Sequence, residues 1–393
     1  MKLRLTLTTK SVKNNQAGRV QKATPVLLVV RELASGGIER DVTKLALGFS
    51  PDRFTPYVAT YKPAGPRFDE LTAAGVPILH LNLKSIASTD ALKAAIKLRR
   101  LIRDHHIKVV HAFDASAVFV VPIAKILRVP VVLSSMLGSR SLLDPKSQKQ
   151  IAFTDKLVDA VVVNCEAMRT HLISDWQVAP DHIELCYNGV DTREFYPSAA
   201  GRLPEYADAS VVIGAVCVLR PEKNLQLLQA AFAKVKGLSP NAILLLVGSG
   251  PELDRLKQNA ASLGIAGNSV FVPASQQVAS FMRSMDIFVS CSYSEAFSNS
   301  ILEAMACGTC VVGSRVGGTP ELISDAENGL LFTSNDANDL ADKLARLIQE
   351  PALRKRFGEQ AAQFAATRLS MAVNLARTGE IYNQFLRAKK VIA

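Results

Sequence analysis

Short hydrophobic runs rich in β-branched residues alternate with segments of helical periodicity from residue 24 onward. The runs are apolar throughout, which is typical of strands buried on both faces of a parallel sheet. Helical segments at 38–49 and 89–105 lie between them, so the pattern predicts βαβ units with right-handed crossovers and a doubly wound sheet. The predicted strands of this first set are 25–30, 56–61, 77–82, 107–113, 129–134 and 159–164.

The pattern pauses at residues 187–210, which are rich in turn-forming residues, and then starts again. The second set of runs, at 211–217, 242–248, 270–273, 286–290 and 309–314, predicts a second sheet of the same kind. Two α/β halves joined by a linker leave a cleft between them, where ligands commonly bind. We expect five parts: a basic flexible leader (1–23), an N-terminal Rossmann-like domain (24–190), a linker (191–210), a C-terminal Rossmann-like domain (211–370) and a C-terminal helix packing back on the N-terminal domain (371–393).

Length and composition fit a multidomain globular protein, with 393 residues of which 48% are hydrophobic. The net charge of +11 is uneven, since residues 1–22 hold six Lys or Arg and no Asp or Glu. A solvated tail or a contact with anionic lipid fits this leader. Nucleic acid does not, because aromatic residues are not interleaved with the basic ones. The six cysteines lie mostly in apolar runs, and the start of the chain lacks a secretory apolar stretch, so we expect a cytoplasmic protein.

The stretch SEAFSNSILEAMACGTC (294–310) places two glutamates eight positions apart around the start of an apolar helix. Ser298 is a plausible N-cap, so Glu295 lies on the loop before the helix and Glu303 in its second turn. The free N–H groups of a helix start favour phosphate, and carboxylates beside it favour hydroxyl donors. A ligand with both phosphate and polyol character, such as a nucleotide sugar, fits this arrangement. The alternative is that both acids only complement the helix dipole.

Four further motifs accompany this stretch in a fixed order: SGGIER (35–40), YNGVDTREFYP (187–197), VLRPEKNL (218–225) and GSGPELDRLKQNAASLG (248–264). Together with residues 294–323 they resemble the retaining family-4 glycosyltransferases, which have the GT-B fold and a glutamate-x7-glutamate signature. The resemblance covers most of the chain. It implies two doubly wound Rossmann-like domains facing across a cleft, with a nucleotide-sugar donor held mainly by the C-terminal domain.

The resemblance also implies residue roles. Glu303 would hold the ribose hydroxyls and Glu295 the hydroxyls of the transferred sugar. The diphosphate would be bound by the backbone N–H groups of Ser298, Asn299 and Ser300. Lys223 matches the lysine that stabilises charge on the departing diphosphate, with a solvated loop lysine as the alternative. Gly36 and Gly37 match the glycine loop that lies over the donor phosphates near the acceptor, with a simple tight turn as the alternative.

Two departures from the family pattern concern individual residues. Val218 stands where the family has a phosphate-binding arginine, and Arg220 can reach a phosphate from an offset position. Met136 stands at the usual position of a histidine after the fifth strand. His111 matches a different family histidine near the cleft, with a packed, hydrogen-bonded role as the alternative, and Arg140 is a further candidate for a cleft cation.

The sequence shows no convincing motif for a metal ion or for a dinucleotide cofactor. No Asp-x-Asp motif is evident in a strand-end loop, and Asp336, Asp339 and Asp342 have the spacing of a solvated helix face. The segment GSG (248–250) lacks the third glycine of a dinucleotide fingerprint, and C-x-x-C at 307–310 lacks partners for a zinc site. We expect metal-independent transfer without a cofactor.

The resemblance thus implies a retaining hexosyltransferase that moves a sugar from a nucleotide diphosphate to an acceptor hydroxyl, and we expect UDP donors first, although the sequence itself does not identify the base or the sugar. The resemblance implies a saccharide or lipid-linked acceptor and a role in cell-surface polysaccharide, lipopolysaccharide or glycolipid synthesis. The basic stripe at 93–108 fits a solvated helix face or a contact with an anionic membrane at its inner surface. Two alternatives remain open: a relative that binds a nucleotide sugar without transfer, and a nucleotide-sugar epimerase of the same architecture.

Overall fold

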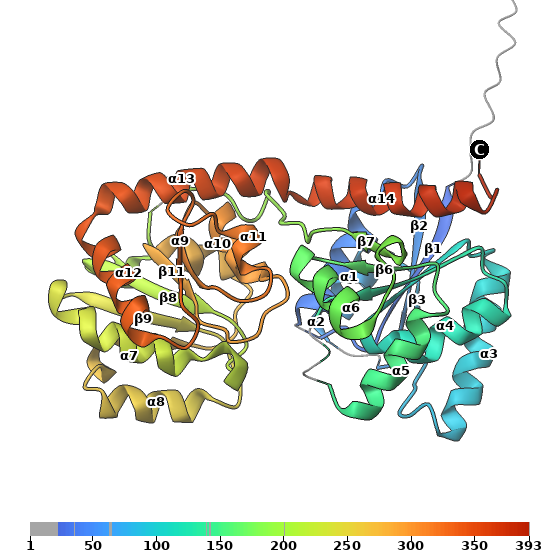
Figure 1. Ribbon diagram of the computed structural model, residues 1–393, viewed down its shortest axis with the longest axis horizontal. Coiled ribbons are helices and arrows are strands. Elements are labelled where there is room, and N and C mark those ends of the chain that lie inside the picture. The colour runs from blue at the N-terminus through green and yellow to red at the C-terminus, as the bar shows by residue number, and fades with distance from the viewer. Residues whose placement is uncertain are drawn as a thin grey trace, which may run out of the picture.

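A computed structural model describes residues 23–34, 36–62, 65–138, 140, 143–199 and 201–392. Two lobes lie side by side, and the last two helices run along one side of both (Figure 1). The predicted leader lies outside the described residues, apart from its last residue.

The N-terminal lobe is built on a seven-stranded sheet in the order β3-β2-β1-β4-β5-β6-β7, within the described residues. Every strand pair in it is parallel. Buried β-branched side chains on both faces explain why these segments form strands. The strands are β1 (Thr24–Val30), β2 (Phe54–Thr60), β3 (Ile78–His80), β4 (Val109–Phe113), β5 (Val131–Met136), β6 (Ala160–Val163) and β7 (Ile183–Leu185).

The C-terminal lobe holds a parallel six-stranded sheet in the order β10-β9-β8-β11-β12-β13. Its order reverses direction between β8 and β11, and ligands of open α/β sheets bind at the carboxyl ends of strands at such a point. The strands are β8 (Val211–Val216), β9 (Ala242–Val247), β10 (Ser269–Val272), β11 (Ile287–Ser290), β12 (Cys310–Ser314) and β13 (Leu330–Phe332).

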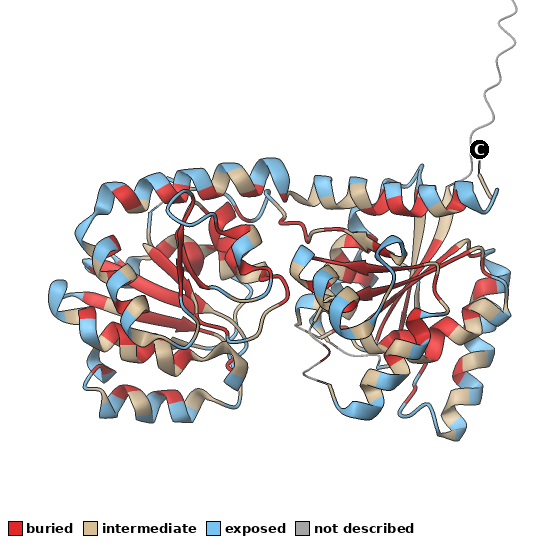
Figure 2. Ribbon diagram, in the orientation of Figure 1, coloured by how far each residue is buried: buried red, intermediate tan, exposed pale blue. Residues whose placement is uncertain are grey.

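Helices cover both sheets, so the strands are buried and the outer helix faces are exposed (Figure 2). The N-terminal lobe carries α1 (Gly37–Gly48), α2 (Pro66–Ala73), α3 (Thr89–Asp104), α4 (Ala117–Ile126), α5 (Pro145–Asp155) and α6 (Glu166–Trp176). The rest are α7 (Leu225–Val235), α8 (Leu253–Ser262), α9 (Val278–Ser284), α10 (Asn299–Ala306), α11 (Thr319–Leu322), α12 (Ala337–Gln349), α13 (Pro351–Arg368) and α14 (Met371–Ala388). Short 3-10 turns are η1 (Asp114–Ser116), η3 (Pro180–His182), η4 (Pro204–Tyr206), η5 (Pro221–Lys223), η6 (Lys236–Leu238) and η7 (Ala266–Asn268).

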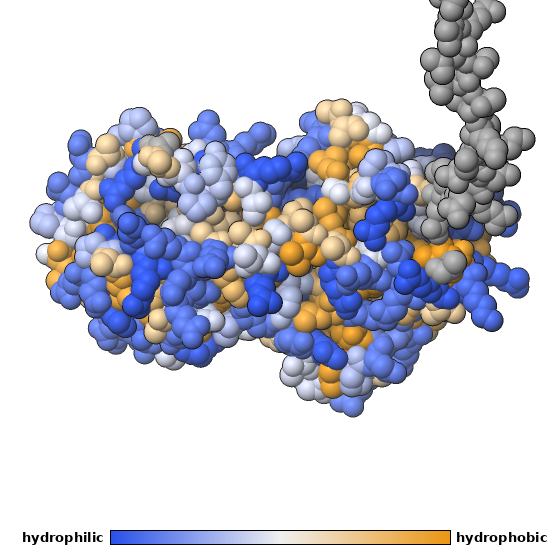
Figure 3. Space-filling view, turned by 90° about the horizontal axis from the view of Figure 1, so that it is seen from above, coloured by the Kyte–Doolittle hydropathy of each residue, from blue (hydrophilic) through white to orange (hydrophobic). Residues whose placement is uncertain are grey.

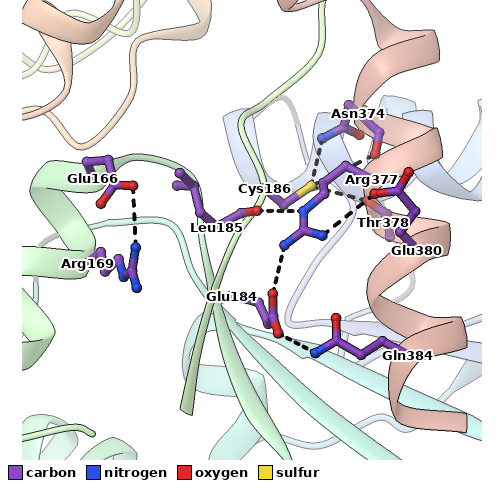
Figure 4. Close-up of polar contacts among 10 residues, drawn as sticks. All are labelled: Glu166, Arg169, Glu184, Leu185, Cys186, Asn374, Arg377, Thr378, Glu380 and Gln384. Carbon is purple, nitrogen blue, oxygen red and sulfur yellow. Dashed lines mark hydrogen bonds and ion pairs between the residues drawn. The ribbon is translucent and has the colours of Figure 1, made fainter. Parts of the chain in front are cut away.

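The chain passes between the lobes twice, and the two passages are tied together. The backbone N–H of Val190 donates to Leu369 O at 2.8 Å, and that of Met371 donates to Val190 O at 2.8 Å. Beyond this junction α14 packs on the N-terminal domain. Arg377 bonds the Glu184 carboxylate at 2.7 Å and Leu185 O at 3.1 Å (Figure 4).

The surface on the side of α13 and α14 is mostly polar. Hydrophilic residues cover most of this face, and hydrophobic ones form separate groups on it (Figure 3). No helix in the described part of the chain is both long enough and apolar enough to cross a bilayer.

Candidate active site

The start of α10 has the form that the sequence predicts. β11 ends at Ser290, a loop follows, and the Ser298 side chain accepts a hydrogen bond from Ile301 N at 3.4 Å. This confirms Ser298 as the N-cap. The first turn, with Asn299 and Ser300, carries backbone N–H groups that a helix cannot satisfy internally, so this end of α10 is suited to an anion.

Glu295 and Lys223 form an ion pair beside this helix start. Lys223 Nζ lies 2.6 Å from Glu295 Oε2, and Ser292 Oγ donates to the same carboxylate at 3.2 Å. The two residues come from loops after β8 and β11, which are neighbours in the sheet. Burial alone would lower the pKa of Lys223, but the adjacent Glu295 carboxylate outweighs it and raises that pKa. Lys223 is therefore a charged lysine held in place, not a freely solvated one.

Arg220 lies just before η5 and is only weakly held. Its side chain is exposed, and its ion pair with Glu222 is long, at 3.9 Å. Val218, at the position where an arginine was expected, is 42% exposed. The Arg220 guanidinium can reorient towards a bound anion at little cost, because an exposed ion pair of this length contributes little.

Glu303 is buried and faces the other domain. Its side chain is 3% exposed, and its Oε1 lies 2.6 Å from Arg40 Nη2 on α1 of the N-terminal lobe. Glu303 and Glu295 thus have different cationic partners in this structure. Arg40 was not among the residues singled out from the sequence, although it is the last residue of the SGGIER motif.

The glycine loop of the N-terminal lobe lies against the start of α10. A Cβ on Gly37 would come within 3.5 Å of Asn299 Nδ2, and a Cβ on Gly36 would lie 2.0 Å from Glu39 Oε2. Asn299 Nδ2 also lies 3.3 Å from both carboxylate oxygens of Asp41. The predicted donor-binding residues of the two domains are therefore neighbours.

His111 lies inside the N-terminal lobe. Its Nδ1 is 2.8 Å from the Tyr382 hydroxyl of α14, and its Nε2 is 2.7 Å from Ser135 Oγ. Burial lowers its pKa to about 3. This is the packed, hydrogen-bonded alternative, so the expectation of a cleft histidine is corrected: both ring nitrogens are already used.

Arg140 requires the same correction. Its side chain is 0% exposed, pairs with Asp155 of α5 and stacks over the Trp176 ring with its guanidinium carbon 4.9 Å from the ring centroid. A guanidinium so enclosed stabilises the packing of α5 and α6 and does not line a cleft.

His111→Gln is expected to remove a pH-dependent part of the stability. The unfolded His111 has a pKa near 6.5 and the folded one a pKa of about 3, so the unfolded state takes up the proton first as the pH falls. The contribution is fully present above pH 6.5 and decreases towards pH 3. Between pH 6.5 and about 4.5, the free energy of unfolding of the wild type should fall by about 2 kcal/mol more than that of the variant in urea titrations. Parallel pH profiles would contradict the buried neutral histidine.

A second group of contacts between the domains centres on Glu321 of α11. Its carboxylate accepts from the backbone N–H groups of Glu166 and Ala167, at 2.8 and 2.9 Å, and from the Tyr187 hydroxyl at 2.9 Å. A residue of the C-terminal domain therefore caps helix α6 of the N-terminal domain. This contact was not predicted, because a cap supplied from over 150 residues away leaves no local pattern.

A small cavity lies under α14 in the N-terminal lobe. Its lining includes His111, Ser135, Asp41 and Asn374, but not Lys223 or the glutamates of the predicted donor site. The described part of the chain holds no group of three or more His, Cys, Asp or Glu placed to bind a metal ion.

The two lobes match two different family models. Residues 35–194 match Glycosyltransferase Family 4, and residues 206–364 match Glycosyl transferases group 1. Among curated relatives, the N-acetyl-alpha-D-glucosaminyl L-malate synthase of Bacillus anthracis is 29% identical over 262 residues, 65% of this chain and 66% of that protein. The D-inositol 3-phosphate glycosyltransferase of Saccharomonospora viridis is 33% identical over 222 residues, 53% of this chain and 51% of that protein. The aligned part thus spans about half to two thirds of these relatives.

Solved structures show the same architecture. A glycosyltransferase from Rickettsia africae has a TM-score of 0.81 at 22% identity, covering 93% of this chain and 99% of that one. Anabaena HepE in complex with UDP has a TM-score of 0.81 at 21% identity, covering 92% and 100%. The two parallel Rossmann-like domains therefore define a GT-B protein, which confirms the predicted fold class. The N-terminal lobe is thus similar to glycosyltransferase family 4 and the C-terminal lobe to glycosyl transferases group 1.

Proposed function

We propose that this protein is a retaining glycosyltransferase that moves a sugar from a nucleotide diphosphate to an acceptor hydroxyl. The observation that carries the proposal is the Lys223–Glu295 ion pair beside the Ser298-capped start of α10. A cation, a hydroxyl-binding carboxylate and free helix N–H groups in one place suit a diphosphate joined to a sugar. Relatives named for sugar transfer, and the similar fold of HepE in complex with UDP-glucose, support the same substrate class.

The residues have the following roles in this proposal. The first turn of α10 and Lys223 bind the diphosphate, Arg220 turns towards it, and Glu295 holds hydroxyls of the transferred sugar. On the face of the leaving group, the bond from the anomeric carbon to the phosphate oxygen breaks while the acceptor oxygen forms its bond to that carbon. The acceptor proton passes to the departing phosphate oxygen. Positive charge from Lys223 and Arg220 stabilises the leaving diphosphate without a metal.

A thermal-shift screen of nucleotide sugars, followed by a transfer assay, tests this function. A donor that binds the folded state raises the melting temperature by mass action, and we expect UDP-sugars to do so first and GDP-sugars second. Incubation of the stabilising donor with saccharide or lipid-linked acceptors should then release free nucleotide and form product with retained configuration. The binding-only alternative would be favoured if a donor stabilises the protein but is neither transferred nor slowly hydrolysed in a way that Glu295→Ala abolishes. Conversion of the donor sugar without an acceptor would favour the epimerase.

We further propose that helix α3 contacts an anionic membrane at the cytoplasmic face, where a lipid-linked acceptor would lie. Exposed apolar residues, Leu92 (70% exposed) and Ile96 (47% exposed), stand among exposed basic ones, as on helices that lie in a bilayer interface. The basic residues are Lys93, Lys97, Arg99, Arg100 and Arg103.

Vesicle co-sedimentation tests this surface. The wild type should bind vesicles containing phosphatidylserine more strongly than vesicles of phosphatidylcholine alone, at about 1 kcal/mol per basic residue near the surface. A variant with Lys93, Lys97 and Arg100 changed to glutamate should lose most of that difference. Equal sedimentation of both proteins would exclude α3 as the membrane contact.

A further inference from the structure

Helices α1 and α10 belong to different domains but lie against each other over one turn. At the start of α10, Gly37 lies next to Asn299, since a Cβ added to Gly37 would be 3.5 Å from Asn299 Nδ2. The same Asn299 nitrogen donates to Asp41 Oδ1 at 3.3 Å. Asn188, near the end of the N-terminal domain, also donates to Asn299, at 3.0 Å. One turn along α10, Arg40 reaches Glu303 at 2.6 Å. The position of Arg40 relative to Glu303 is thus fixed by contacts on the preceding turn.

The surroundings of Glu303 make Arg40 important for the position of its carboxylate. Glu194 of the linker and Asp41 both lie close enough to Glu303 to be repelled by it. The pKa values of Glu194 and Asp41 are raised mainly by desolvation of their carboxyl groups, and repulsion from Glu303 raises both further. The three acidic groups differ in burial, since Glu303 is buried, Asp41 is partly buried and Glu194 is exposed, and the Arg40 guanidinium attracts all three carboxylates. Removing one partner of a buried ion pair leaves a charge uncompensated, so without Arg40 the Glu303 carboxylate is expected to turn away from its present position.

We propose that Arg40 is a positioning residue for the donor, acting from the N-terminal domain through Glu303. This rests on the proposed function, in which Glu303 accepts hydrogen bonds from the ribose hydroxyls. Arg40 Nη2 lies 2.6 Å from Glu303 Oε1, and this ion pair holds the carboxylate in its orientation. A carboxylate has about four lone-pair sites on two oxygens, so the Glu303 carboxylate retains capacity for the ribose. Nucleotide affinity then depends on a side chain that lies outside the donor-binding domain.

Calorimetric titration with two probes, UDP and 2′,3′-dideoxy-UDP, tests the proposal. The readout is the ratio of the two dissociation constants. This ratio measures how much the ribose hydroxyls contribute to binding, and a general loss of folded protein does not change it. The proteins are the wild type, Arg40→Met, Arg40→Lys, Glu303→Ala and a matched control, Arg67→Met. Arg67 also lies in the N-terminal domain and pairs with a glutamate at 2.6 Å, but its partner Glu70 is on the same helix.

The wild type and Arg67→Met should bind UDP at least about tenfold more tightly than the dideoxy nucleotide, as expected for a hydrogen bond to a charged group. In Arg40→Met and in Glu303→Ala, UDP should bind no more than about threefold more tightly than the dideoxy nucleotide. Arg40→Lys should give an intermediate ratio, because lysine restores the positive charge but not the planar guanidinium.

Two sets of results would overturn the proposal in different ways. If the wild type binds neither nucleotide, or Glu303→Ala keeps the wild-type ratio, the donor site of the proposed function fails and this inference fails with it. If those proteins behave as expected but Arg40→Met keeps the ratio, or binds UDP more tightly than the wild type, the inference alone is overturned, and Arg40 is a structural or a competing residue.

Discussion

Glu295→Gln is expected to lower kcat for sugar transfer by about 10²–10³-fold, the size of effect seen when one preorganised polar group at a reacting centre is removed. The substitution keeps the shape of the side chain but removes the charge that pairs with Lys223 at 2.6 Å. It also weakens the carboxylate as an acceptor of sugar hydroxyls. Initial rates at saturating donor, together with urea titrations of both proteins, measure the effect.

The control for this prediction separates catalysis from stability. Loss of one partner from the half-buried pair should cost only about 1–3 kcal/mol of unfolding free energy, so the protein remains folded while transfer is lost. Glu350→Gln, which removes one partner of the exposed Arg346–Glu350 pair in the same domain, should leave kcat unchanged. A Glu295→Gln enzyme with near wild-type kcat would show that the ion pair is structural and would remove Glu295 from the mechanism.

Most of the fold was predictable from the hydrophobic pattern alone. Strands with long buried runs, such as β1 and β9, fall within two residues of their predicted bounds. Two strands were not predicted, β7 (Ile183–Leu185) and β13 (Leu330–Phe332), which are edge strands of three residues each. Such short strands are defined by pairing with a neighbour and not by a pattern of their own.

The site was predictable where its determinants are local. The Ser298 cap and the loop position of Glu295 follow from turn and helix signals within a few residues. The partners of Glu303 and Asn299 were not predictable, because Arg40 and Asp41 come from the other domain over 250 residues earlier in the chain. His111 shows the same limit: its end-of-strand position left both interpretations open, and Tyr382 of α14 decides between them.

Gly317→Ala is expected to abolish transfer, with a loss of at least about 10²-fold, although residue 317 carries no reactive group. Gly317 has φ +49°, and a Cβ there would lie 1.7 Å from the backbone carbonyl oxygen of Glu295. A backbone atom cannot rotate away as a side chain can, so the loop that carries Glu295 must shift. A displacement of about 1 Å at a reacting group is enough for a loss of this size. Transfer assays and thermal-shift titration with the donor measure it.

Gly264→Ala is the matched control, because it introduces the backbone strain of a positive φ without a steric clash between the added Cβ and another residue. Gly264 lies in the same domain with φ +63°, and a methyl group added there would have no atom of the described residues within 4 Å beyond its chain neighbours. Its substitution should cost about 1 kcal/mol of unfolding free energy and leave transfer unchanged. If Gly317→Ala behaves like Gly264→Ala, the position of Glu295 does not depend on its contact with Gly317. If only Gly317→Ala loses transfer, the glycine pair after β12 sets the position of the Glu295 loop, and the motif at 294–323 acts as one structural unit.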